Sequence, residues 1–150
     1  MQALAMNVDA LTPSEILDLL ELFRNFSVPV RDWRHLRQKI SAGKALLLNQ
    51  ENTIAGCALV QRAPRYMDGA AILAAFVYRW DYNKESDISA MLSSIAEACR
   101  PQYFYLLMDV NQRHELNLEC YRRFGFQNAI WPSPNGKENR LLIADLAKVK

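Results

Sequence analysis

Hydrophobic positions in the first part of the chain recur with the period of an α-helix. A short, mostly apolar segment at residues 2–8 precedes the motif Thr-Pro-Ser-Glu at residues 12–15, which combines a capping threonine, a proline suited to the first helical position and a glutamate three residues after the cap. Apolar residues then return at helical spacing as far as Pro29. The pattern predicts a strand over residues 2–8, a helix that begins at the capping motif and a second helix over residues 31–41.

The period changes from helical to extended after Gly43, a residue suited to ending the second helix. Two apolar runs, residues 45–48 and 54–60, flank a polar turn and predict an antiparallel hairpin. The other predicted elements are a strand over residues 70–80, a helix capped by Ser86 or Asp87, a strand over residues 103–110, a helix that contains Tyr121, and strands over residues 126–131 and 140–146.

This order of elements predicts a single domain over residues 1–150, of the α+β class with a mixed (α/β) sheet. We expect a central, twisted and mostly antiparallel sheet of about six to seven strands with helices on both faces. The composition, with 51% hydrophobic and 23% charged residues, fits one globular domain with a substantial core.

Charge and cysteine content argue against several classes of protein. The formal net charge of +2 is too small to predict nucleic-acid binding, and no apolar run approaches the length of a membrane span. Three cysteines without CxxC spacing predict neither a disulfide framework nor a zinc site, and they fit a reducing, cytoplasmic environment. The two histidines share no ligand spacing, so we expect no metal.

The most informative segment is the helical run that ends in Tyr-Arg-Arg-Phe-Gly-Phe at residues 121–126. Together with the order of elements, this ending resembles the last helix of the GCN5-related N-acetyltransferase (GNAT) superfamily, and the resemblance covers essentially the whole chain. In the family pattern, a valine on the fifth strand precedes by four positions an asparagine that opens the last helix, and the tyrosine follows seven positions later. Val110, His114 and Tyr121 occupy that register, with histidine in place of asparagine.

The resemblance implies transfer of an acyl group from a thioester to an amine, and it makes Tyr121 the candidate acid. A phenol can protonate the thiolate as it leaves, whereas the alternative is a tyrosine that packs its ring on the sheet and keeps its hydroxyl at the surface. His114 is a candidate base for the incoming amine, unless it is an exposed histidine at a helix start. Asn117 is a candidate for orienting the hydroxyl or a ligand, unless it is a solvated polar residue.

The loop that binds the pyrophosphate of coenzyme A in this family departs from the family pattern here. Tyr82, Glu85 and Asp87 fall at its arginine and its two glycine positions, and the interval between Gly69 and Gly125 contains no glycine. Side chains block a close approach of backbone to phosphate, and two carboxylates oppose its charge. The resemblance therefore implies a degenerate pyrophosphate-binding loop. In the alternative interpretation, the acidic residues stabilise the start of a helix.

The resemblance also places the ligands. Pantetheine in this fold lies between the splayed fourth and fifth strands, so the donor is expected to be acetyl-CoA, another acyl thioester, or an acyl carrier protein, whose prosthetic group lacks the pyrophosphate. Basic residues of the second predicted helix would suit such an acidic carrier protein. The candidate donor-binding residues are Ala75, Phe76, Val77, Tyr78, Arg79, Lys84 and Asn117, and the candidates for lining the acceptor pocket, unless they are core residues, are Phe26, Trp33 and Trp131.

Two functions remain open at this point. The first is an N-acyltransferase with atypical or weak coenzyme A binding and an unknown amine acceptor, which Tyr121 favours. The second is a catalytically inactive module of the same fold that binds a partner or a small ligand, which the degenerate loop favours. A third interpretation, an unrelated α+β domain, predicts a sheet with no splay between the fourth and fifth strands. Terminal strands that extend a sheet would allow a homodimer.

Overall fold

The computed structural model describes residues 1–26, 28–109, 115–132 and 138–149, without the side chains of residues 115–117, 130–132 and 138–140. The strands are β1 (Gln2–Ala5), β2 (Lys44–Gln50), β3 (Thr53–Arg62), β4 (Ala70–Tyr78), β5 (Tyr105–Asp109), β6 (Gln127–Pro132) and β7 (Glu138–Asp145). The helices are α1 (Pro13–Asn25), α2 (Trp33–Ser41), α3 (Glu85–Cys99) and α4 (Glu115–Phe124), with short 3-10 turns η1 (Val8–Ala10) and η2 (Trp80–Tyr82).

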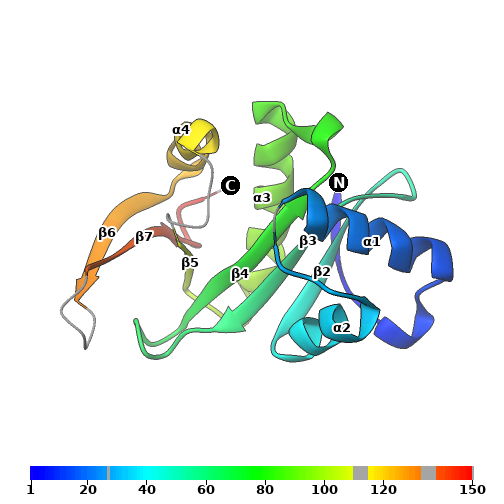
Figure 1. Cartoon of the computed structure of the whole chain (residues 1–150). Coiled ribbons are helices and arrows are strands. Elements are labelled where there is room, and N and C mark those ends of the chain that lie inside the picture. Colours follow the sequence, from blue (N-terminus) through cyan, green and yellow to red (C-terminus); the bar gives the residue numbers. More distant parts are fainter. Residues whose placement is uncertain (27, 110–114, 133–137, 150) are drawn as a thin grey trace.

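The strands form one seven-stranded sheet in the order β1-β2-β3-β4-β5-β7-β6 (Figure 1). All neighbouring strands are antiparallel except β4 and β5, which are parallel and are connected through α3. The predicted α+β class and mostly antiparallel sheet are therefore confirmed. Within the described residues, no helix is both long enough and apolar enough to cross a bilayer.

The capping motif forms as the sequence predicts. The Thr12 hydroxyl accepts a hydrogen bond from the Glu15 N–H at 3.2 Å, and the Glu15 carboxylate accepts one from the Thr12 N–H at 2.9 Å. Two of the backbone donors at the start of α1 are satisfied in this way, which fixes where the helix begins. Asp32 caps α2 by accepting a hydrogen bond from the His35 N–H at 2.9 Å.

Helices cover both faces of the sheet (Figure 1). On one face, α3 and α4 pack over a large core that includes Leu46 and Leu48 of β2. On the other face, α1 and α2 pack over a second core that includes Leu47, the residue between them. Successive strand residues point to opposite faces, so the continuous apolar run of β2 supplies both cores.

Several predicted boundaries were wrong. The first strand ends at Ala5, and the segment that follows forms η1, where the Asn7 side chain accepts a hydrogen bond from the Asp9 N–H at 3.2 Å. The third helix is not capped by Ser86 or Asp87. It begins at Glu85, and the residue before it, Lys84, makes no side-chain capping hydrogen bond. A helix start with no side-chain cap leaves little local signal in a sequence.

Candidate functional site

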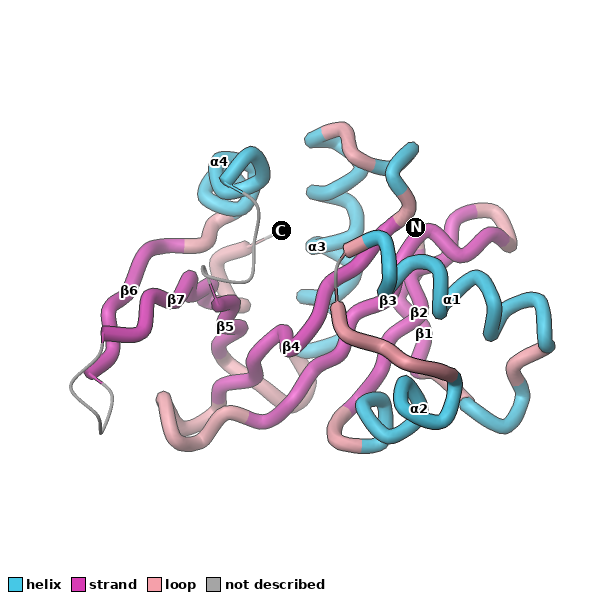
Figure 2. The backbone as a smooth tube through the Cα atoms, in the orientation of Figure 1, coloured by secondary structure: helices cyan, strands magenta, loops and turns pink. Residues whose placement is uncertain are grey.

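The sheet opens between β4 and β5. The parallel pairing of these strands runs from Ala70–Tyr105 to Leu73–Met108 and goes no further within the described residues. Beyond it, β4 continues to Tyr78 and stays paired with β3 on its other side. Figure 2 shows β4 and β5 diverging. The splay that the third interpretation excludes is present, so that interpretation is wrong.

A β-bulge in β4 accounts for the divergence. Leu59 of β3 pairs with Ala75, but the next residue of β3, Val60, pairs with Leu73, so Ala74 is an extra residue in β4. Ala74 and Ala75 both pack on the α1 and α2 side, whereas alternation would place them on opposite faces. A bulge bends and twists its strand, which turns the second half of β4 away from β5.

Four of the predicted donor-binding residues, Ala75 to Tyr78, belong to the part of β4 that has left β5. Backbone groups of this segment that face away from β3 border the opening. A segment of this kind can hydrogen-bond an extended ligand as it would a neighbouring strand. The position fits the predicted donor site, although the role of these residues in binding stays a prediction.

Phe26, just after α1, lies beside the last residue of β4. Its ring meets that of Tyr78 edge-on, with 4.7 Å between the centroids, and it packs against both cores. A side chain can touch residues from both faces of a sheet around an edge or past the end of a strand, and Phe26 does so at the end of β4. Trp33, at the start of α2, packs against the α1 and α2 core.

Tyr121 is buried on α4, with 2% of its surface exposed. Its ring belongs to the core beneath α3 and α4 and lies edge-on to Phe126, with 6.3 Å between the centroids. This burial contradicts the alternative in which the hydroxyl stays at the surface. His114 lies outside the described residues, as do the side chains of Asn117 and Trp131.

The charged residues between β4 and α3 are largely neutralised by partners within the protein. Arg79 donates from Nε and Nη2 to the two carboxylate oxygens of Asp81, each at 3.2 Å. At the start of α3, the Glu85 carboxylate accepts a hydrogen bond from Arg123 of α4. This hydrogen bond and the charge of Glu85 raise the pKa of Arg123 above its usual range. Lys84 has no ion-pair partner among the described residues.

The ion pair between Glu85 and Arg123 joins the two sides of the opening. Glu85 begins the helix that follows β4, whereas Arg123 lies near the end of the helix that follows β5. The sequence does not predict this ion pair, because a partner 38 residues away leaves no local signal. Arg122 is bound to Glu119 on its own helix, at 2.6 Å.

The cysteines are core residues. Burial raises the pKa of Cys57 to about 12, and it raises that of Cys99 to about 11 although nearby Lys44 lowers it. Such thiols remain protonated near neutral pH and are poor nucleophiles. Cys120 is also buried. Within the described part of the chain, no three His, Cys, Asp or Glu side chains gather in a way that could hold a metal ion.

Several solved structures with the same architecture are acetyltransferases. An aminoglycoside 6'-N-acetyltransferase from Enterococcus faecium superposes with a TM-score of 0.70 at 12% identity, over 97% of each chain. The ribosomal-protein-S18-alanine N-acetyltransferase from Escherichia coli gives 0.65 at 15% identity, over 91% of this chain and 90% of that one. The chain has the GNAT fold.

A third GNAT structure carries a ligand. A GNAT family acetyltransferase from Elizabethkingia anophelis with acetyl-CoA bound superposes with a TM-score of 0.62 at 17% identity, over 96% of this chain and 97% of that one. No protein-family model matches the sequence, and no curated protein matches it. The resemblance predicted from the Tyr121 segment and the order of elements is thus confirmed at the level of the fold.

Proposed function

We propose that the protein is an N-acyltransferase that moves an acyl group from an acyl thioester to an amine. The observation that carries the proposal is the opening of the sheet along Ala75 to Tyr78, in a GNAT fold that keeps a tyrosine on α4. The acetyl-CoA bound to a structural neighbour supports an acyl-CoA type of donor.

In this proposal the donor enters the opening as an extended ligand. Backbone N–H and C=O groups of Ala75 to Tyr78 hydrogen-bond its pantetheine amides. An amine, with His114 as its base, attacks the thioester carbonyl, and the tetrahedral intermediate collapses. The leaving thiolate takes the proton of the Tyr121 hydroxyl, so the products are an amide and a free thiol. Asn117 orients the hydroxyl or the donor, and Phe26, Trp33 and Trp131 line the acceptor side.

The nucleotide part of coenzyme A is held weakly in this proposal. The first turn of α3, which would receive the pyrophosphate, carries the carboxylates of Glu85 and Asp87. The two arginines nearby, Arg79 and Arg123, are bound to carboxylates of the protein. Lys84 is the cation best placed to meet a phosphate. The donor is therefore acetyl-CoA held mainly through pantetheine, or an acidic acyl carrier protein in the cytoplasm.

The ion pairs around α3 also favour a second candidate, a catalytically inactive GNAT-fold module that binds a partner or a small ligand. Arginines that are already paired with carboxylates of the protein bind a phosphate less readily. The two candidates differ in one respect that can be measured, namely whether Tyr121 affects turnover.

Replacing Tyr121 with phenylalanine tests the enzyme directly. We expect turnover with acetyl-CoA and a panel of primary amines to fall by about a hundredfold, because the general acid is lost. The free energy of unfolding should change by no more than about 1.5 kcal/mol, the contribution of one hydrogen bond. Tyr103→Phe, which makes the same change in a residue packed against the same core, is the control and should keep full turnover. Full turnover in Tyr121→Phe would falsify the acid role.

Replacing Glu85 with glutamine tests the account of weak coenzyme A binding. The change frees Arg123 and removes one negative charge from the start of α3. We expect the affinity for acetyl-CoA to rise by about threefold to tenfold in calorimetric titration, and that for acetyl-pantetheine to stay the same, since only acetyl-CoA carries the pyrophosphate. Glu119→Gln, which frees Arg122 instead, is the matched control. An equal gain for both ligands would place the obstacle elsewhere.

A further inference from the structure

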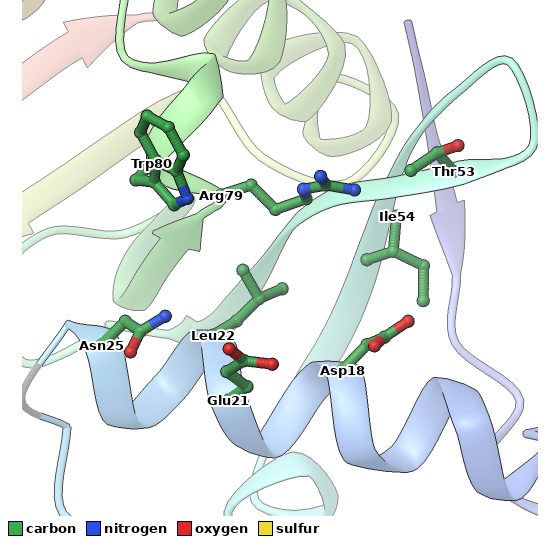
Figure 3. Close-up of a pocket in the computed structure, with 8 residues that line it drawn as sticks. All are labelled: Asp18, Glu21, Leu22, Asn25, Thr53, Ile54, Arg79 and Trp80. Carbon is green, nitrogen blue, oxygen red and sulfur yellow. The ribbon is translucent and has the colours of Figure 1, made fainter.

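A pocket of about 270 Å³ lies between α1 and the strand ends that face it (Figure 3). Asp18, Glu21 and Asn25 line it from the helix, and Arg79 and Trp80 line it from the segment after β4. It is separate from the Tyr121 site, because α1 covers one face of the sheet and α4 the other. Typical pockets for drug-sized ligands begin at roughly 300 Å³, so a ligand here would be small.

The helix side of the pocket is negatively charged. Asp18 and Glu21 are one turn apart on α1, and in Figure 3 both carboxylates point from the helix toward the space below Arg79. Among the described residues, neither carboxylate has an ion-pair partner. The cation in the lining, Arg79, is held in two hydrogen bonds by Asp81, which does not line the pocket. The two carboxylates are therefore available to pair with a positively charged ligand.

The opposite side of the pocket presents an aromatic face. Trp80 is 80% exposed, the highest value among the exposed large hydrophobic side chains that the structure describes. It begins the turn η2, which is closed by a hydrogen bond from the Tyr82 N–H to the Arg79 carbonyl at 2.9 Å. An indole face attracts cations and packs against methylene groups. Because Trp80 is exposed at the pocket wall, its ring does not stabilise the core and is accessible to a ligand.

We propose that this pocket binds a small aliphatic diamine. Its ammonium groups pair with Asp18 and Glu21, its methylene chain lies against Trp80, and the Asn25 carbonyl is available as a further acceptor. Two carboxylates one helical turn apart match a ligand with two ammonium groups better than one with a single charge. The site does not depend on acyl transfer, since Asp18, Glu21, Asn25 and Trp80, the residues that would contact the diamine, are not among those assigned to the donor or to Tyr121.

The test is titration of the whole protein with 1,4-diaminobutane, followed by calorimetry and by the indole N–H signal of Trp80, which a Trp80→Phe variant assigns. The uncharged analogue 1,4-butanediol is the ligand control. We expect saturable binding of the diamine, a shift of the Trp80 signal and no binding of the diol. Asp18→Asn with Glu21→Gln should weaken binding at least about tenfold, and Trp80→Ala about threefold.

A control variant separates specific contacts from net charge. Asp68→Asn with Glu97→Gln removes two exposed carboxylates away from the pocket and should leave binding unchanged. Equal weakening in this variant would mean attraction to the overall charge, and full affinity in the Asp18 and Glu21 variant would mean a different site. Either result overturns the proposal. Tyr121→Phe should bind the diamine normally, so a failure of the acyltransferase proposal can be told apart from a failure of this one.

Discussion

The two parts of the sheet on either side of the opening are built differently. From β1 to β4, each strand pairs antiparallel with the next, and helices cover both faces. Among the described residues, the part made of β5, β7 and β6 pairs with β4 along Ala70 to Leu73 and no further. On the face opposite α4, loop side chains such as Tyr66 and Met67 pack over it in place of a helix. The two parts thus share a core despite the opening between them, since the core beneath α3 and α4 includes residues of both.

The strongest test of whether the two parts unfold together is to remove one large buried aromatic ring from each part. Phe23 of α1 and Phe126, just before β6, are both buried. We expect Phe23→Ala and Phe126→Ala each to lower the free energy of unfolding by about 3–5 kcal/mol, measured by urea denaturation. Both variants should still unfold in one cooperative transition, because a shared core couples the parts.

Phe104→Ala is the control for this pair, because its ring is 73% exposed and its loss should cost about 0.5 kcal/mol or less. Two separate transitions in Phe126→Ala would show that the parts fold independently, in contradiction to the shared core.

The comparison can be sharpened at β3, which is the only strand partner of the second half of β4 in the described residues. A Cβ at Gly56 would lie 2.6 Å from the Val77 carbonyl oxygen and 3.1 Å from the Tyr78 Cβ. Gly56→Ala should therefore destabilise the protein by about 2 kcal/mol and weaken donor binding, because it pushes β4 toward the opening.

Gly43→Ala is a matched control for that change. Its Cβ would meet the Val60 carbonyl oxygen at 2.4 Å, a similar clash with backbone of β3, but at a residue whose β4 partner, Leu73, is still paired with β5. It should destabilise the protein without altering donor affinity in calorimetric titration. Equal loss of affinity in both variants would contradict a special role for the open part of β4.

The smallest expected effect is a change of stability with pH that comes from two buried cysteine thiols, one on each face of the sheet. Cys57 lies on the α1 and α2 side and Cys99 on the α3 side. Burial raises both pKa values from 9.0, to about 12 and about 11, so above pH 9 the unfolded chain binds fewer protons than the folded one. Stability should fall with rising pH by about 1.4 kcal/mol per pH unit and thiol until the folded value is reached.

Cys57→Ala and Cys99→Ala isolate this effect from other groups that titrate in alkali. Each variant should lose less stability between pH 8 and about pH 10 than the unaltered protein, although both start from a lower value because a small cavity forms. Parallel pH profiles would show that the thiols do not stay protonated in the folded state.

Local signals made much of the fold predictable. The capping motif at residues 12–15 predicted the start of α1, and the Tyr121 segment indicated the GNAT fold. The bulge at Ala74 was not predictable, because the run Ala-Ala-Ile-Leu-Ala-Ala-Phe-Val-Tyr is apolar throughout and carries no period that an extra residue could disturb.

The site was less predictable than the fold, because its interactions join residues far apart in the chain. The partner of Glu85 is 38 residues away on another helix, and Arg79, one of the predicted donor-binding residues, is paired with Asp81. Asp18 and Glu21 show only the polar side of a helix in the sequence, and their common pocket with Trp80 depends on how α1 crosses the strands.

The extra residue Ala74 also sets the parity of the rest of β4. Phe76 and Tyr78 belong to the core beneath α3, and Val77 belongs to the core beneath α1. If the same strand ran through Ala74 as a regular ladder, these side chains would exchange faces, and two aromatic rings would point toward α1 and α2. Deleting Ala74 would have the opposite result, because Leu73 and Ala75 would become neighbours opposite Val60 and Leu59, and every later side chain would keep its face. Only the bend that separates β4 from β5 would be lost.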